Sequence, residues 1–173
     1  MMKKAVVESV KEIYHGKTFS FVKEHVTLPN GSSAEMACVR HPGSTAIVPL
    51  LADQTVVLIR QYRYPIGGYL LEVPAGTMEP GESHLNCAKR ELEEETGMVG
   101  ERFQYLAHVH MLPSYSDERI HIYLARGLQP SKQNLDDDEI IQVVRYPLKR
   151  VMEMIATGDI TCALTILAMH RVC

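Results

Sequence analysis

The chain has 173 residues, a length that favours one compact domain with at most a small appended subdomain. Hydrophobic residues make up 46% of the sequence, which is enough for a packed core and excludes extensive disorder. The formal net charge of −3 provides no broad basic face, so we expect no nucleic-acid partner. No stretch approaches the roughly 20 apolar residues that span a bilayer, so we expect no membrane association.

The cysteines are widely scattered, at Cys38, Cys87, Cys162 and Cys173. None of them forms a CxxC pair, which argues against a zinc site. Isolated cysteines are typical of reduced proteins, and the N-terminal segment meets charged residues too soon to form a signal-peptide core. We therefore expect a cytoplasmic protein.

The N-terminal region predicts a small antiparallel sheet. Apolar and polar residues alternate loosely over residues 4–27, and Asn30-Gly31 is a strong hairpin signal ahead of a returning strand at 34–40. The alternative is that these strands simply begin the main core. We divide the chain into an N-terminal β subdomain, residues 1–41, and a main domain, residues 42–173.

The main domain alternates strands with a central helix and ends in helices. Strands are expected at 44–51, 55–62, 69–73, 103–111, 120–128 and 140–146. The central helix starts near Glu82-Ser83 after a loop at 76–81 and stops at Gly97. A short helix follows at 147–157, and Asp159 is expected to cap a last helix that runs to Arg171. This order predicts an α/β fold.

The central helix carries an unusual concentration of acid. At about 100° per residue, Glu91, Glu94 and Glu95 fall in one arc beside the apolar stripe, and Glu93 points away towards water. Like charges one turn apart destabilise a helix by roughly 0.2–0.5 kcal/mol per pair. A solvated acidic face is one explanation, and a hard divalent cation such as Mg²⁺ that neutralises the cluster is the other. Arg90 precedes Glu94 by one turn and can orient its carboxylate.

The segment around this helix resembles the Nudix family. It matches the Nudix box, GX5EX7REUXEEXGU, at every defined position, from Gly76 through Glu82 and the run 90–98. The resemblance implies an α/β/α sandwich, with the small N-terminal antiparallel β subdomain added to it. It also implies an enzyme that holds Mg²⁺, for which Mn²⁺ can substitute, against a diphosphate. Glu82 and Arg90 would then brace the loop and the metal-binding carboxylates.

The resemblance assigns roles to individual residues of the box. The glutamates that match metal ligands are Glu91 and Glu95, and Glu94 matches the residue that assists them in catalysis. The backbone carbonyl of Ala75, immediately before the box glycine, would complete the metal shell.

Residues outside the box resemble the ADP-ribose pyrophosphatase subgroup. The stretches 60–65 (RQYRYP) and 70–76 (LLEVPAG), together with Pro113, carry this likeness. Arg63 would bind substrate, because a guanidinium clamps phosphate in a bidentate manner. The N-terminal strands resemble the segment through which the subgroup forms homodimers.

Two further loops complete the expected site. By analogy Glu118 would contact substrate or its water network; an exposed loop acid is the alternative. In the acidic run 136–139, Glu139 would be a further metal ligand and Asp137 the general base, although a charge run is more commonly a solvated loop.

The expected reaction is Mg²⁺-dependent hydrolysis of the diphosphate bond of a nucleoside diphosphate sugar, with ADP-ribose as the leading candidate, giving AMP and ribose 5-phosphate. Ser114 stands where the subgroup has glycine, so the loop over the terminal sugar differs and GDP-mannose or ADP-glucose remain alternatives. A non-catalytic ADP-ribose-binding regulatory module is an alternative of another class.

Overall fold

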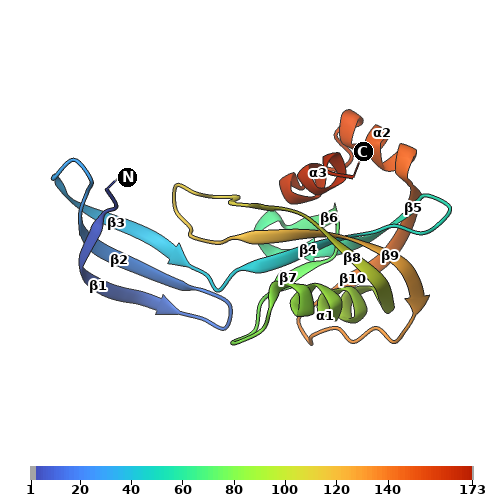
Figure 1. Cartoon of the computed structure of the whole chain (residues 1–173), viewed down its shortest axis with the longest axis horizontal. Helices are drawn as coiled ribbons and strands as arrows, with labels where there is room; N and C mark the ends of the chain where they lie inside the picture. Colours follow the sequence, from blue (N-terminus) through green and yellow to red (C-terminus); the bar gives the residue numbers. More distant parts are fainter. Residues whose placement is uncertain (1–2, 173) are drawn as a thin grey trace. The chain divides into compact units, whose positions relative to one another are not determined.

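The computed structural model describes residues 3–172 and divides into two compact units (Figure 1). The first unit comprises Met1–Gly43 together with His110–Arg119, and the second comprises Ser44–Val109 together with Ile120–Cys173. The first unit therefore includes a segment from the middle of the chain, in addition to the N-terminal residues that were expected to form it. Within residues 3–172, no helix combines the length and the apolar character needed to cross a bilayer.

The first unit is built on an antiparallel sheet with the order β1-β2-β3. Its strands are β1 (Val6–His15), β2 (Ser20–Thr27) and β3 (Ser33–Arg40). The turn between β2 and β3 contains the expected Asn30-Gly31 pair. Asn30 Oδ1 accepts hydrogen bonds from the Ser32 N–H and hydroxyl, and Gly31 takes a left-handed φ of 88°, which glycine adopts without steric cost.

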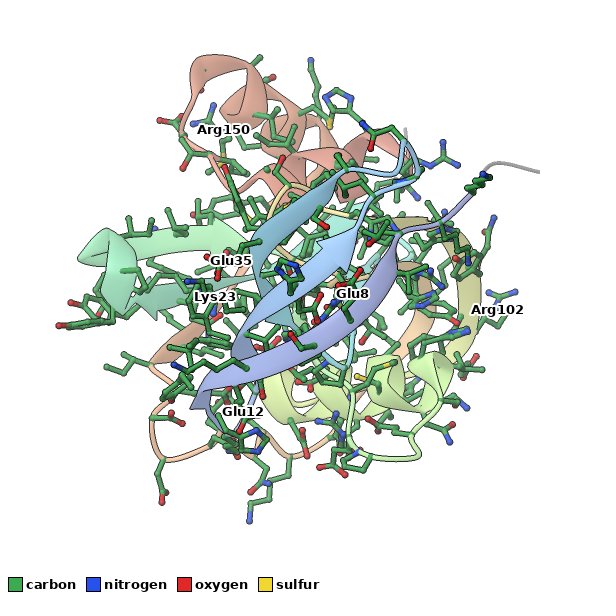
Figure 2. The ribbon with its side chains drawn as sticks, turned by 90° about the vertical axis from the view of Figure 1, so that its left-hand side faces the viewer. Glu8, Glu12, Lys23, Glu35, Arg102 and Arg150 are labelled. Atoms are coloured by element: carbon green, nitrogen blue, oxygen red, sulfur yellow. The ribbon has the colours of Figure 1, made fainter. Side chains whose placement is uncertain are left out.

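The strands of this sheet differ in how much of their side chains is exposed. Every residue of β1 is exposed, including apolar Val6, Val10 and Ile13, whereas β2 alternates between buried and exposed side chains. Charged side chains occupy exposed positions of the sheet. Among them, Lys23 Nζ of β2 lies 2.7 Å from Glu35 Oε1 of β3 (Figure 2). An apolar edge strand left this open is a surface suited to pairing with another chain.

The segment 110–119 is attached to β3 by backbone and side-chain bonds. The N–H of Val39 donates to the Tyr115 carbonyl at 2.7 Å. Arg40 Nη1 donates to Asp117 Oδ2 at 3.0 Å, while its Nη2 contacts both carboxylate oxygens of the buried Glu24 at 2.6 Å. A buried glutamate requires such a cationic partner. Glu24 stands at an inward position of the alternating strand β2, and this pattern is the sequence signal that predicts a partner such as Arg40.

The second unit contains two sheets covered by helices. One sheet has the order β10-β5-β6, and the other has the order β7-β4-β9-β8, in which β4 and β9 are parallel. The strands are β4 (Ser44–Pro49), β5 (Thr55–Arg63), β6 (Gly68–Glu72), β7 (Ala75–Thr77), β8 (Met98–Val109), β9 (Ile120–Pro130) and β10 (Ile141–Pro147). The helices are α1 (His84–Thr96), α2 (Leu148–Thr157) and α3 (Ala163–His170), with a 3-10 turn, η1 (Tyr64–Ile66), between β5 and β6. Helix α1 lies on one side of the sheets and α2 and α3 lie on the opposite side, which gives the expected α/β/α layers (Figure 1).

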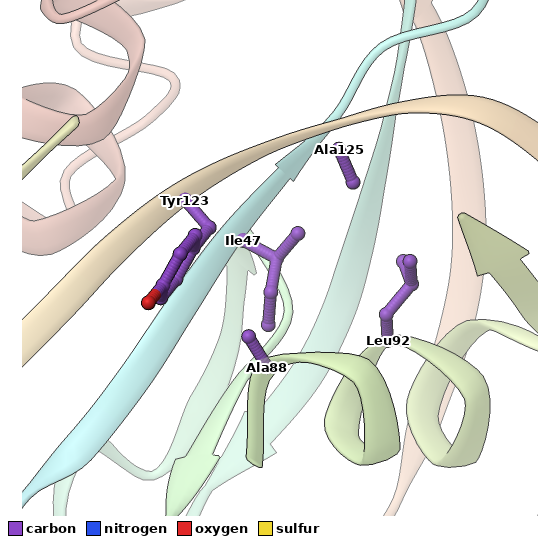
Figure 3. Packing of buried hydrophobic residues seen from close by; sticks show 5 residues of the cluster. All are labelled: Ile47, Ala88, Leu92, Tyr123 and Ala125. Atoms are coloured by element: carbon purple, nitrogen blue, oxygen red, sulfur yellow. The ribbon is translucent and has the colours of Figure 1, made fainter. Parts of the chain in front are cut away.

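The apolar face of α1 is anchored on β4 and β9. Ala88 and Leu92 of the helix pack with Ile47 of β4 and with Tyr123 and Ala125 of β9, and all of these residues are almost fully buried (Figure 3). Because a core packed to near-crystalline density resists displacement, this contact fixes the rotation of α1 about its axis and so fixes where its glutamates point.

Most of the predicted elements of the main domain are present, and three details were wrong. Gly76 and Thr77, expected as the start of a loop, belong to the short strand β7, because residues 75–77 pair antiparallel with residues 44–46. Strand β8 begins at Met98, directly after α1, and not at Phe103. Asp159 does not cap the last helix, since α3 begins only at Ala163; Asp159 instead accepts a hydrogen bond from the hydroxyl of Thr157.

Candidate active site

Helix α1 begins and ends on the local signals present in its sequence. At its N-terminus the Ser83 hydroxyl accepts a hydrogen bond from the Asn86 N–H at 3.2 Å. At its C-terminus Gly97 adopts a left-handed φ of 64° and donates its N–H to the Glu93 carbonyl at 2.8 Å. Glu93 lies away from this cluster; it is half-buried and accepts a hydrogen bond from the Ser131 hydroxyl at the surface.

Arg90 is the centre of the acidic cluster. Its Nε and Nη2 donate to the two carboxylate oxygens of Glu82, each at 3.0 Å, in a bidentate pair. Its Nη1 donates to Glu91 Oε1 at 2.7 Å and to Glu94 Oε2 at 2.9 Å. A fifth bond runs from Nη2 to the Thr77 carbonyl at 3.1 Å. One guanidinium therefore joins the loop before α1 to two of the expected metal-site glutamates, and only the planar five-donor geometry of arginine can do this.

Glu91 is buried and lies directly against Gly76. Only 7% of Glu91 is exposed, and a Cβ atom on Gly76 would lie 2.0 Å from the Glu91 carboxylate. Burial raises the pKa of Glu91 to about 7, against the opposing effect of Arg90, with further increases from Glu94 and Glu139. The glycine of the box is thus required by the space that this carboxylate occupies.

Glu95 is the most deeply buried of the helix carboxylates. It is 1% exposed, and its Oε2 accepts a hydrogen bond from the Ala75 N–H at 2.8 Å. Burial raises the pKa of Glu95 well above its usual value, and the negative charges of Glu91 and Glu139 raise it further. Strand β7 supplies the backbone group, because its pairing with β4 brings Ala75 beside the helix.

The acidic run 136–139 contributes Glu139 to this environment. Glu139 is half-buried, and its negative charge helps to raise the pKa of both Glu91 and Glu95. Its carboxylate also accepts a hydrogen bond from the Asp136 N–H at 3.0 Å. Asp137, the expected general base, is exposed in the same loop. Of these two residues, Glu139 is therefore the one whose charge acts on the helix glutamates Glu91 and Glu95.

Arg63 lies at the end of β5 and is paired with Glu72 of β6. Arg63 Nε donates to Glu72 Oε2 at 2.8 Å, and Glu72 is only 7% exposed. The positive charge of Arg63 also lowers the pKa of Glu95, which places it near the acidic cluster. Arg63 was predicted as a site residue and its partner Glu72 was not, although a single glutamate inside an otherwise apolar strand is a recognisable signal for a buried ion pair.

Glu118 belongs to the first compact unit rather than to the unit that carries α1. There its Oε1 lies 3.8 Å from His41 Nδ1, and its backbone N–H donates to the Ser116 hydroxyl at 3.1 Å. The structure therefore brings Glu91, Glu94, Glu95, Glu139 and Arg63 into one unit, while the predicted contact of Glu118 with substrate stays a prediction.

The donor set suits a hard divalent cation, although its side chains are turned towards other partners. Among residues 3–172, no group of three or more His, Cys, Asp or Glu side chains is gathered so that it could hold a metal ion. Glu91 and Glu94 point to Arg90, and Glu95 points to the Ala75 N–H. Carboxylate and carbonyl oxygens are nevertheless the ligands that Mg²⁺ and Mn²⁺ prefer.

Comparison with known proteins decides the family. Residues 40–161, most of the chain, match the model described as NUDIX domain. The chain belongs to the Nudix family. It is 35% identical to the methanol dehydrogenase activator of Bacillus methanolicus over 92% of this chain and 88% of that protein. It is 31% identical to the ADP-ribose pyrophosphatase of Bacillus subtilis, with the same shares covered.

A solved structure supports the same assignment for this Nudix chain. The crystal structure of an ADP compounds hydrolase superposes with a TM-score of 0.83 at 26% identity, and the match covers 99% of this chain and 94% of that one. Because nearly the whole chain takes part in the superposition, the α/β fold with its N-terminal β strands is confirmed.

Proposed function

We propose that this Nudix protein is a divalent-metal-dependent pyrophosphohydrolase that cleaves the diphosphate bond of a nucleoside diphosphate sugar. ADP-ribose, hydrolysed to AMP and ribose 5-phosphate, is the substrate we put first. The names of two similar proteins, ADP-ribose pyrophosphatase and ADP compounds hydrolase, support this choice of substrate class.

One observation carries the proposal. Glu91 and Glu95 are both buried on one face of α1, and burial raises the pKa of each. Arg90 is hydrogen-bonded to Glu91 but is also committed to Glu82 and Glu94. Burying acidic groups without full compensation is unfavourable. A divalent cation would compensate these carboxylates and would in turn bind a diphosphate.

The residues that would hold Mg²⁺, or Mn²⁺ in its place, are Glu91, Glu95 and the carbonyl of Ala75, with Glu94 and Glu139 assisting. Such a cation polarises phosphate oxygens and lowers the pKa of a bound water. Arg90 would hold Glu94 and Glu91 in position before the cation binds and would be released from part of that contact afterwards.

Around the metal site, the chain's own side chains would bind substrate and move a proton. Arg63, fixed in direction by Glu72, would bind a phosphate oxygen of the substrate. Asp137 on the exposed loop would accept the proton of the attacking water, and Glu118 would contact the substrate or its water network.

Substitution of Glu94 tests the proposal most directly. Glu94→Gln keeps the size of the side chain but removes its charge, and we expect turnover of ADP-ribose with Mg²⁺ to fall by about 100-fold or more. Glu93→Gln, on the adjacent position of the same helix, is the matched control and should retain activity. Full turnover by Glu94→Gln, with its circular dichroism unchanged, would contradict the metal-cluster model.

The substrate panel must include other nucleoside diphosphate sugars. Ser114 differs from the glycine expected in that loop, and this is the observation that keeps GDP-mannose and ADP-glucose as second candidates. The non-catalytic alternative, an ADP-ribose-binding regulatory module, predicts tight binding of ADP-ribose without release of AMP at any Mg²⁺ or Mn²⁺ concentration.

We also propose a cytoplasmic homodimer joined through the N-terminal β segment. The exposed apolar side chains Val6, Val10 and Ile13 of β1 support the interface. The free thiols of Cys38, Cys87 and Cys162 fit a reducing compartment. Sedimentation equilibrium should show a dimer for the wild type and a shift towards monomer for Val10→Asp.

A further inference from the structure

The side-chain amide of Gln61 carries an unsatisfied hydrogen-bond acceptor. Gln61 lies in β5 and is 6% exposed. Among the described residues, its Oε1 is the buried side-chain polar atom for which no hydrogen-bond partner is found. Because native interiors pair nearly all of their buried polar atoms, an acceptor of this kind calls for a ligand donor or another explanation.

The position of Gln61 places it beside the proposed site. Side chains alternate along a strand, so Gln61 projects from the same face of β5 as Arg63, two residues later. Across the sheet Gln61 pairs with Ile141 of β10, and Ile141 follows the proposed ligand Glu139 by two residues. The N–H of Tyr62, the neighbour of Gln61, donates to the Ile140 carbonyl at 3.0 Å. Gln61 is therefore held between the strand end that carries Arg63 and the loop that carries Glu139.

The polarity of the unsatisfied atom restricts the ligand group that can pair with it. A carbonyl oxygen accepts hydrogen bonds, so deprotonated phosphate oxygens and carboxylates cannot satisfy it. Sugar hydroxyls can, because each carries an O–H donor, and a nucleoside diphosphate sugar brings several of them next to its diphosphate. Water, free or held by a cation, is another O–H donor.

We propose that Gln61 is a substrate-positioning residue whose Oε1 accepts a hydrogen bond from a hydroxyl of the nucleoside diphosphate sugar. The proposal rests on the proposed function and adds a contact to it. Gln61 would hold a hydroxyl of the sugar while Arg63, on the same strand face, holds a phosphate oxygen. The two contacts together would fix the register of the substrate along β5.

The test replaces Gln61 by methionine, which has a similar length but no strong acceptor. Titration calorimetry with the non-hydrolysable α,β-methylene analogue of ADP-ribose, in the presence of Mg²⁺, should show a Kd about tenfold higher for Gln61→Met than for the wild type. Gln142→Met is the matched control, because Gln142 is exposed and pairs with Arg60 on the opposite face of the same sheet. It should leave the Kd unchanged.

Two more measurements separate substrate positioning from other roles. The thermal midpoint of the ligand-free variant should be equal to or above that of the wild type, because methionine removes a buried acceptor without a partner. A fall of several degrees would make Gln61 a structural residue and overturn the proposal. The affinity for Mg²⁺ alone should be unchanged; a loss as large as that for the analogue would assign the acceptor to cation-bound water and overturn it as well.

Failure of this inference is distinguishable from failure of the proposed function. If the wild type binds the analogue and Gln61→Met binds it equally well, the role of Gln61 is wrong while the proposed substrate class stands. If the wild type itself does not bind the analogue with Mg²⁺, the substrate class is wrong and the contact with Gln61 falls with it.

Discussion

Gly76 and Glu91 occupy complementary space: a Cβ atom at position 76 would lie 2.0 Å from Cδ and Oε1 of the Glu91 carboxylate. The contact joins β7 to α1 and leaves no room for any side chain. Glu91 is buried there, so the carboxylate can yield only by losing its bond to Arg90 or by moving the strand.

Gly76→Ala is therefore expected to displace the Glu91 carboxylate. A misplacement of about 1 Å can cost on the order of 100-fold in rate, so we predict a loss of that size in hydrolysis of ADP-ribose. Gly68→Ala is the control, since its added methyl group meets nothing within 4 Å. Steady-state kinetics of the two variants check the prediction, and equal activity would refute it.

Arg90→Gln should destabilise the metal-free protein, because it removes the guanidinium to which Glu82, Glu91 and Glu94 are all hydrogen-bonded. Removing one partner of a buried pair costs about 3–5 kcal/mol, and partial exposure of Arg90 reduces this to roughly 2 kcal/mol. Urea unfolding in EDTA measures the effect. Arg150→Gln, which breaks an exposed pair with Glu153, should change stability by less than about 0.5 kcal/mol.

The stability of the metal-free protein should fall as pH rises from about 4.5 to about 7. Burial raises the pKa of Glu91 from 4.5 to about 7, so over this window the folded state binds a proton that the unfolded state has released. Below pH 4.5 the protonated Glu91 contributes its full stabilisation, on the order of 3 kcal/mol, and this contribution is lost as the pH rises to about 7.

Chemical denaturation in EDTA across this pH range tests the linkage. Glu91→Gln should flatten the dependence, because a neutral amide has no proton to lose. Added Mg²⁺ should restore stability most strongly at the alkaline end, where the ligands are ionised. A wild-type curve in EDTA that rises over the same window would show that Glu91 is not a source of this dependence.

Glu139→Gln and Asp137→Asn should affect the protein differently. Glu139 acts electrostatically on Glu91 and Glu95, so its neutralisation should weaken Mg²⁺ activation, which is measured as a higher Mg²⁺ concentration at half-maximal rate. Asp137→Asn should lower kcat by about 100-fold or more at saturating Mg²⁺ and leave the Mg²⁺ concentration at half-maximal rate unchanged. If Glu139→Gln lowers kcat by that amount at saturating Mg²⁺ and Asp137→Asn does not, the general base is Glu139.

The parts of the fold that follow local rules were predictable from the sequence. Helix α1 could be bounded because Ser83 and Gly97 are capping residues, and the Asn30-Gly31 turn could be placed because its geometry requires those residue types. The separation of Glu93 from the other glutamates followed from helical periodicity, but its bond to Ser131 joins residues far apart in sequence and could not be foreseen.

Contacts between distant segments account for what the sequence did not predict. The bidentate contact of Arg40 with Glu24, the pairing of Arg63 with Glu72 and the attachment of 110–119 to β3 all depend on which strands become neighbours. The helix acids were expected as a cluster, yet their division between Arg90 and the Ala75 N–H depends on the position of β7, which no periodicity reveals.

The pairing of Val109 with Ile120 at the end of β8 and β9 has a practical consequence for protein engineering. Since these residues are direct cross-strand partners, residues 110–119 form a long loop between two strands whose ends are already paired. A two-residue Asn-Gly turn could replace this loop and reconnect the strands. Joined to a chain that starts at Ser44, this change would test whether the second unit folds and hydrolyses substrate alone. Comparison with the full chain would then measure what the two removed segments contribute to substrate choice.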